Sequence, residues 1–126
     1  MLKKKSRRVI EKLGIGIDVV QIKRFQDIPY SSNHKFYKKI FLPSEIKYCL
    51  KFKDASKHFA GKFAIKEAVK KSICDNIDFL HIQTSHLHFK PEVKLIGNIA
   101  KKYNFMISLS HEQEVAVGIV ISEKIE

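Results

Sequence analysis

Two carboxylates and a set of lysines are the residues of this 126-residue chain whose types and spacing could do chemistry. Glu67 lies among lysines on a stretch with helical periodicity, where residues three or four apart share one face. Asp18 ends an apolar stretch in which nothing local calls for a charge except capping of the next turn. If the helix packs across that stretch, the two carboxylates could bind one Mg²⁺ ion together with substrate phosphate oxygens. The lysines that would contact the same phosphates are Lys62, Lys66 and Lys71, so the pattern predicts a diphosphate substrate.

The same residues also allow structural interpretations, which the sequence leaves open. Glu67 and Lys71 are spaced for a salt bridge within the helix, worth about 0.2–0.5 kcal/mol beside a solvated lysine face. Capping of the next turn would by itself explain Asp18.

Histidines form a further group of candidates. Residues 108–111 resemble a strand with alternating hydroxyls that ends in His111, which could contact phosphate or assist proton transfer. A hairpin histidine without a role is the alternative. His86 and His88 lie two apart on a predicted strand and could both face a zinc ion, but no third ligand is evident, which favours an exposed hairpin.

The charge of the chain predicts an anionic partner. There are 24 Lys and Arg against 13 Asp and Glu, a formal net charge of +11. Residues 1–12 form a basic N-terminal extension, which we expect to be solvated, and residues 23–71 hold most of the remaining positive charge. A nucleic-acid-binding module is the alternative function, but it would carry aromatic residues among basic ones on an exposed sheet. Here most basic residues lie on predicted helices, so we expect no nucleic-acid partner.

Composition limits the class of protein. Hydrophobic residues make up 44% of the chain and nine are Phe, enough for the core of one domain. No apolar run reaches the roughly 18 residues that span a bilayer, and the basic start is not followed by the apolar segment of a signal peptide. We therefore expect a cytoplasmic protein without a membrane partner. Cys49 and Cys74 lack metal-site spacing and are expected to be reduced.

Hydrophobic periodicity predicts an α+β domain over residues 13–126. It begins with a buried strand over 13–20 whose end presents Asp18. The other predicted elements are short helices over 21–27, 34–40, 43–50 and 97–103, a long helix over 55–73, and strands over 79–84, 87–96, 105–110 and 115–121.

Three blocks of sequence carry a family resemblance. They are Gly-Ile-Gly-Ile-Asp at 14–18, FAGKFAIKEAVKKS at 59–72, whose Lys-Glu-Ala core is the specific part, and ISLSH at 107–111. In order and spacing they resemble the signature blocks of holo-[acyl-carrier-protein] synthase, the small bacterial class of 4′-phosphopantetheinyl transferase. The resemblance implies the fold of that family, one long helix packed on a mostly antiparallel sheet, and a homotrimer with active sites between subunits.

The activity implied by the resemblance is a Mg²⁺-dependent transfer of phosphopantetheine from coenzyme A to a serine of apo acyl carrier protein, in fatty acid biosynthesis. The other product is adenosine 3′,5′-bisphosphate, and no covalent enzyme intermediate is needed. By position, Asp18 and Glu67 would be metal ligands, and Glu67, or a water aligned by it, would deprotonate the serine. The phosphate-binding residues would be Lys66 and Lys71 at the diphosphate, and Lys62 and His111 at the nucleotide phosphates with Ser110 beside them. Asp18, Glu67 and Lys71 form the implied catalytic set.

The resemblance also implies a docking surface for the acidic carrier protein on the helix that follows the Asp18 strand. Arg24 is the leading candidate, and Lys23, Phe25 and Lys35 are its expected neighbours. Solvated basic faces remain the alternative for the lysines of the next helix.

The sequence departs from the family pattern at several positions. Lys62 stands where the family usually has arginine, so a bidentate phosphate ligand becomes a point charge. The loop at 72–78 is short and lacks glycine, and Glu112 replaces a common threonine.

Overall fold

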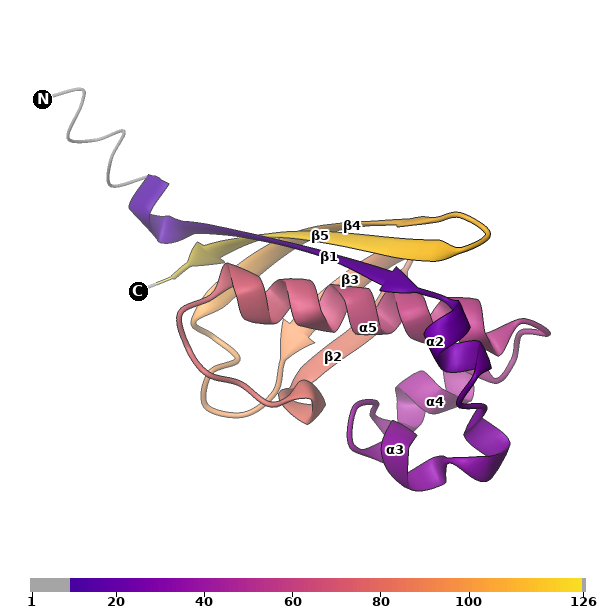
Figure 1. Cartoon of the computed structure of the whole chain (residues 1–126). Helices are drawn as coiled ribbons and strands as arrows, with labels where there is room; N and C mark the ends of the chain where they lie inside the picture. The colour runs from indigo at the N-terminus through magenta and orange to yellow at the C-terminus, as the bar shows by residue number, and fades with distance from the viewer. Residues whose placement is uncertain (1–9, 126) are drawn as a thin grey trace, which may run out of the picture.

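The structure is a computed structural model, and it describes residues 10–125. One long helix, α5 (Ala55–Ser72), packs on a three-stranded antiparallel sheet of order β1-β5-β4 (Figure 1). The sheet strands are β1 (Leu13–Gln21), β4 (Tyr103–His111) and β5 (Val115–Lys124), and a separate antiparallel pair is formed by β2 (Ile82–Leu87) and β3 (Lys90–Leu95). The short elements are α2 (Lys23–Gln26), η1 (Tyr30–Ser32), α3 (His34–Lys38), α4 (Pro43–Cys49) and η2 (Phe79–His81). The predicted α+β class is confirmed.

Glycines allow β1 and β5 to approach α5 closely, Gly16 on β1 and Gly118 on β5. A methyl group added at Gly16 would overlap the carbonyl oxygen of Ala68, and one added at Gly118 would lie 3.0 Å from the backbone of Ala64. Strand β1 therefore lies along the helix, as Figure 1 shows, and at Gly14 and Gly16 no side chain of the strand separates the two backbones. This contact fixes the position of every β1 side chain relative to α5.

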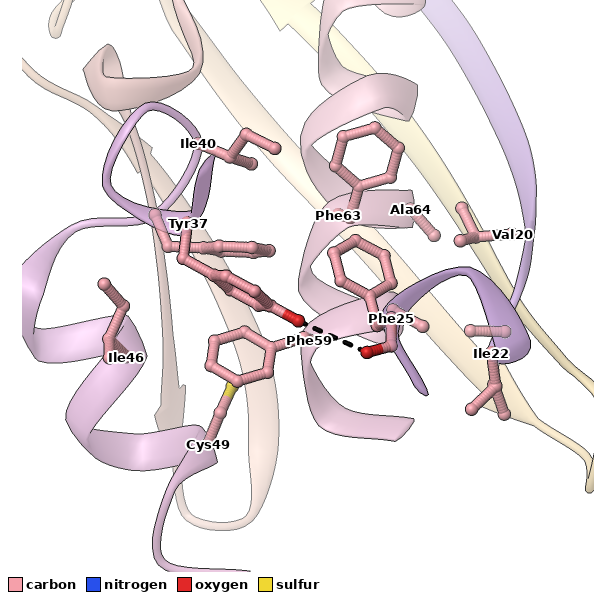
Figure 2. Packing of buried hydrophobic residues seen from close by; sticks show 13 residues of the cluster. Val20, Ile22, Phe25, Tyr37, Ile40, Ile46, Cys49, Phe59, Phe63 and Ala64 are labelled. Atoms are coloured by element: carbon pink, nitrogen blue, oxygen red, sulfur yellow. Dashed lines mark hydrogen bonds between the residues drawn. The ribbon is translucent and has the colours of Figure 1, made fainter. Parts of the chain in front are cut away.

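Two hydrophobic clusters hold α5 in place. The first is aromatic and packs α2, α3 and α4 against the first half of the helix (Figure 2). Phe25 is its centre, with its ring centroid 5.6 Å from that of Phe63, and the Tyr37 hydroxyl donates to the Phe25 carbonyl oxygen at 3.4 Å. The second cluster is mainly aliphatic and packs β2 and β5 on the second half of the helix through residues such as Ile82, Val69 and Val120.

Some predicted elements are wrong in extent or type. The first strand ends at Gln21, close to the predicted end at 20, but it is not buried on both faces, because Ile15 and Ile17 are 66% and 54% exposed on its outer face. No helix forms over 97–103, where two turns closed by Ala100 N–H to Gly97 O and Lys102 N–H to Ile99 O connect the strands. The predicted strand at 79 starts at Ile82, after the 3-10 turn η2. Most of the predicted basic extension, residues 1–12, lies outside the described residues.

Within residues 10–125, no helix combines the length and apolar character needed to cross a membrane. The cytoplasmic location stays a prediction.

Candidate active site

Asp18 and Lys71 form an ion pair across the contact between β1 and α5. The Lys71 ammonium donates to Asp18 Oδ1 and to the carbonyl oxygen of Ile17, both at 3.0 Å. Lys71 therefore bonds to the strand, and the alternative of an intrahelical salt bridge with Glu67 is not realised. Capping does not explain Asp18 either, because Ile22 is the N-cap of α2 and no side chain bonds there.

The register of β1 against α5 sets the level of Asp18 along the helix, because strand and helix run in opposite directions. Gly16 of β1 lies against Ala68 of α5. Two residues further along β1, Asp18 pairs with Gly118 of β5, and Gly118 lies against Ala64, one helical turn before Ala68. Asp18 is therefore level with the turn of α5 that carries Glu67.

The two carboxylates fit a Mg²⁺ site of the predicted kind. Glu67 is partly buried and makes no hydrogen bond or ion pair to any residue in the described part of the chain, so its oxygens are available as ligands. Among residues 10–125 no group of three or more potential ligand side chains gathers at one point. Substrate oxygens and waters would have to complete the coordination, as is usual for Mg²⁺.

A second feature is a small cavity of about 100 Å³ that opens beside α5. Lys62 and His111 both line it, as do Tyr48, His58 and His86. We call this the lysine cavity. Lys62 is only 4% exposed, and its ammonium donates to a single described acceptor, Thr84 Oγ1, at 3.0 Å. His111 Nε2 is buried and has no hydrogen-bond partner in the described chain.

Burial makes positive charge costly in the lysine cavity. It lowers the pKa of the Lys62 ammonium, an effect that the nearby Cys49 and Glu45 oppose. Burial also lowers the pKa of His111, and the charge of Lys57 adds to this. A buried ammonium with spare donors beside an unpartnered imidazole favours an anion as ligand, since the anion would satisfy both groups.

Residues 14–120 match the family model described as the 4′-phosphopantetheinyl transferase superfamily. The chain belongs to this superfamily.

Full-length relatives place the chain within one branch of the superfamily. It is 31% identical over 122 residues to "Holo-[acyl-carrier-protein] synthase" of Geotalea daltonii, covering 88% of this chain and 98% of the relative. The protein of that name from Trichlorobacter lovleyi is 35% identical over 122 residues, with 88% and 97% covered.

The solved structures that this chain resembles include holo-[acyl-carrier-protein] synthases as well. The holo-[acyl-carrier-protein] synthase of Helicobacter pylori in complex with coenzyme A superposes with a TM-score of 0.74 at 32% identity, covering 86% of this chain and 99% of that one. The Bacillus anthracis enzyme in complex with CoA (3′,5′-ADP) gives 0.76 at 27% identity, with 89% and 96% covered. The family and the fold predicted from the sequence are confirmed.

Lys66 is not available as a phosphate ligand. Its side chain is completely buried, and its ammonium donates to Glu45 Oε1 at 2.6 Å and to the carbonyl oxygens of Ile40 and Phe79 at 2.8 and 3.0 Å. Three acceptors use all three donors of an ammonium group. The prediction that Lys66 faces the diphosphate is therefore wrong, and the lysine holds α4 and η2 against α5.

Ser110 also lies elsewhere than predicted. Alternate residues of β4 face opposite sides of the sheet, and Ser110 is exposed on the outer face while His111 points inward. It does not line the lysine cavity.

His86 and His88 do not face one zinc ion from the same strand, because His88 lies in the hairpin turn with φ of 50° and not on β2.

The predicted docking residues are only partly available. Phe25 is 1% exposed at the centre of the aromatic cluster, so it cannot contact a partner as predicted. Arg24 is exposed and lies over the Phe63 ring, with 4.9 Å between the guanidinium carbon and the ring centroid. Lys23 pairs with Asp27 at 3.0 Å, and Lys35 is exposed on α3.

Glu45 and Thr84 have no role in the sequence-based predictions, although both line up behind Lys62 in the structure. Glu45 is 1% exposed, although an acidic residue in the first turn of a helix is ordinarily explained by the helix dipole. Thr84 is at a buried position of β2, a strand of mostly polar residues, and carries no chemical signal of its own. The early Pro-Ser-Glu of α4 marks a helix start, but nothing local indicates that the carboxylate is buried.

Proposed function

We propose that the protein transfers 4′-phosphopantetheine from coenzyme A to a serine hydroxyl of an apo acyl carrier protein and releases adenosine 3′,5′-bisphosphate. The observation that carries the proposal is the packing of β1 on α5, which pairs Asp18 with Lys71, one helical turn from Glu67. The relatives named holo-[acyl-carrier-protein] synthase and the structures solved with coenzyme A support it.

The reaction forms a bond between the serine oxygen and the β-phosphorus of coenzyme A and breaks the bond from that phosphorus to the bridging oxygen. Glu67 accepts the serine proton, directly or through an aligned water. Lys71, held at Asp18, offsets negative charge that builds on the diphosphate. Asp18 and Glu67 would hold Mg²⁺, which as a Lewis acid neutralises phosphate charge when bound.

The nucleotide half of coenzyme A requires anion-binding groups away from the reacting phosphorus. Lys62 and His111 suit this role, since both line the lysine cavity with unused hydrogen-bonding capacity. The cavity volume of about 100 Å³ suits a phosphate group, and the rest of the nucleotide would lie outside it.

The acidic carrier protein would dock on the exposed cations of α2 and α3. Arg24, Lys23 and Lys35 lie on this surface. Long-range attraction between these cations and an acidic helical partner would raise the association rate and would weaken with salt.

The outer face of the sheet supports the homotrimer implied by the family. Four apolar side chains on this face are between 54% and 72% exposed: Ile15, Ile17, Val19 and Met106. They lie on β1 and β4 of the same sheet, and Ser110 shares the face. A second copy that covered this face would remove apolar surface from water and bring Ser110 to an interface between subunits.

The test of the proposed function is a mass measurement. The protein is mixed with apo acyl carrier protein, coenzyme A and Mg²⁺, and the carrier is then weighed. We expect a gain of one phosphopantetheine arm on one serine, and an unchanged carrier mass would overturn the proposal.

A further inference from the structure

We propose that Thr84 and Glu45 are positioning residues for Lys62 and hold its ammonium in the lysine cavity as an anchored phosphate ligand. The inference rests on the proposed function, because it assumes that the cavity receives a phosphate of coenzyme A. It assigns a role to two buried polar residues that touch neither the reacting atoms nor the proposed metal ligands.

The three residues form a continuous chain of hydrogen bonds from three elements. Lys62 of α5 donates to Thr84 Oγ1 of β2 at 3.0 Å, and Thr84 Oγ1 donates to Glu45 Oε2 of α4 at 2.5 Å. Lys62 is 4% exposed, Thr84 is 5% exposed and Glu45 is 1% exposed, so water does not compete with these bonds.

The chemistry of the groups fixes the direction of each bond. A hydroxyl has one proton to donate, and a carboxylate can only accept. The Thr84 proton therefore points to Glu45, and the lone pairs of Thr84 point to Lys62. The negative charge of Glu45 polarises the hydroxyl and strengthens its bond to the ammonium.

Glu45 is itself immobilised. Its Oε1 accepts from Lys66 at 2.6 Å and from the Leu42 N–H at 2.7 Å, and its Oε2 accepts from both the N–H and the hydroxyl of Thr84. Lys66 has no donor left for another partner. The anchor of Lys62 is thus a saturated network that joins α4, α5 and β2.

The network contains two ammonium groups and one carboxylate. Lys66 balances Glu45, so the charge of Lys62 has no full partner in the described chain. The face of the Tyr48 ring lies 4.7 Å from the Lys62 ammonium and limits its movement on another side. Two donors of Lys62 stay available to an anion from the cavity.

The anchor orders a side chain that is flexible by itself. A guanidinium presents a rigid planar fork to phosphate, whereas an ammonium on a four-carbon stem must be ordered by its surroundings. Thr84 and Tyr48 supply that order here.

The experiment compares nucleotide binding and kinetics of Thr84 variants. Thr84→Val keeps the shape of the side chain and removes the hydroxyl, while Thr84→Ser keeps the hydroxyl. We expect Thr84→Val to raise the Kd for adenosine 3′,5′-bisphosphate and the KM for coenzyme A about tenfold, the effect of one hydrogen bond to a charged group. The KM for the carrier should not change, and Thr84→Ser should stay within about threefold of the parent protein.

The matched control is Ser122→Ala. Ser122 is 1% exposed and donates to the Ser72 carbonyl oxygen at 2.8 Å, so the variant removes an equally buried hydroxyl that does not contact Lys62. It should lower stability without changing nucleotide affinity. If Thr84→Val does not fold, Thr84→Cys keeps the size with a weaker acceptor and should weaken nucleotide binding in the same direction.

The double variant decides whether Thr84 acts through Lys62. In a Lys62→Met background, Thr84→Val should cause no further loss of nucleotide affinity. The inference would be overturned if Thr84→Val bound the nucleotide as tightly as the parent protein does. It would also be overturned if Thr84→Val lowered nucleotide affinity as much in the Lys62→Met background as in the parent protein. Failure of the proposed function is seen separately, as absence of transfer by the parent protein in the mass assay.

Discussion

Lys62, Lys66, Lys70 and Lys71 of α5 differ sharply in their surroundings. Lys62 has one protein acceptor and an aromatic ring, Lys66 is saturated in the core, Lys70 lies 3.7 Å from the centroid of the Phe79 ring, and Lys71 pairs with Asp18. Of the four, Lys66 is the one whose three donors are all used within the described chain, so it has no capacity for a phosphate. The distinction depends on what lies opposite each side chain, because the four residues are chemically identical.

Glu67→Gln is expected to abolish transfer and leave folding almost unchanged. The amide is nearly isosteric but has neither the negative charge nor the basicity of the carboxylate. We expect kcat to fall roughly 10²–10⁴-fold, the usual effect of losing a general base. Transfer at the parental rate would show that Glu67 does not have the proposed role, and a urea unfolding curve checks the fold.

Arg24→Glu is expected to raise the KM for the carrier several-fold, on the order of 3–10-fold, because the charge reversal repels an acidic partner. The KM for coenzyme A should not change. The effect should shrink as salt is added. Lys124→Glu, an exposed charge reversal at the end of β5, is the control, and equal weakening by both variants would argue against docking at Arg24.

Acid is expected to destabilise the protein through the histidines of the lysine cavity. Burial lowers the pKa of His58 and His111 below the ordinary 6.5 in the folded chain. Below pH 6.5 the unfolded chain therefore binds more protons at these histidines than the folded chain does. The contribution of these histidines to the free energy of unfolding is highest above that pH and decreases as the pH falls from 6.5 toward the pKa values of the folded chain. Urea unfolding at pH 7.5 and pH 5.5 should show this loss. His111→Gln should reduce the pH dependence, and an unchanged slope would contradict the assignment.

At the scale of elements, the site depends on the distance between β1 and α5. Gly16 has no side chain to separate them, and the resulting contact places Asp18 within reach of Lys71. The motif Gly-Ile-Gly-Ile-Asp is therefore a packing signal as well as a ligand signal. Its glycines lie against the helix and its isoleucines lie on the outer face.

Gly16→Ala is expected to destabilise the fold by about 1–3 kcal/mol and to reduce transfer strongly. The added methyl group meets the Ala68 carbonyl oxygen, a backbone atom that cannot rotate away, so β1 must shift and carry Asp18 with it. Gly97→Ala is the control. It costs a similar roughly 1–3 kcal/mol through its φ of 95°, but nothing lies within 4 Å of the added atom and transfer should persist. Equal activity of the two variants would contradict the role of Gly16.

At the scale of the whole molecule, one side of the sheet is core and the other is exposed. The inner face packs on α5, while the outer face of β1 presents branched aliphatic residues to solvent. In an antiparallel sheet with one face on the core and the other in water, the residues on the water-exposed face are ordinarily polar. Apolar residues on both faces favour a protein partner, and a second copy is the partner implied by the family.

Ile15→Glu is expected to convert a trimer to a monomer. A carboxylate at a residue that is 66% exposed in one chain would be buried at the interface without a partner. Sedimentation equilibrium should give three chain masses for the parent protein and one for the variant. Phe89→Glu, at a hairpin residue that is 101% exposed, is the control and should leave the trimer intact. A monomeric parent protein would contradict the proposed assembly.

Periodicity and local motifs were sufficient to predict the long helix, most strands and the family. The step of three and four residues along 55–72 is a property of the helix itself, and Asp18, Glu67 and Lys71 stand within short local blocks. The residues that we propose to carry the reaction therefore all lie in local sequence motifs.

Only the tertiary structure decided which lysines are available and what holds them. Lys62 and Lys66 stand on similar local sequence, yet Glu45, 21 positions from Lys66, helps to saturate that ammonium, and Thr84, 22 positions from Lys62, orients the other. Burial of Phe25 and the outward direction of Ser110 were settled in the same way, by packing and by the parity of a strand. Local sequence specifies an element and its chemistry, whereas burial and hydrogen-bond saturation arise from residues distant in the chain that meet only when it folds.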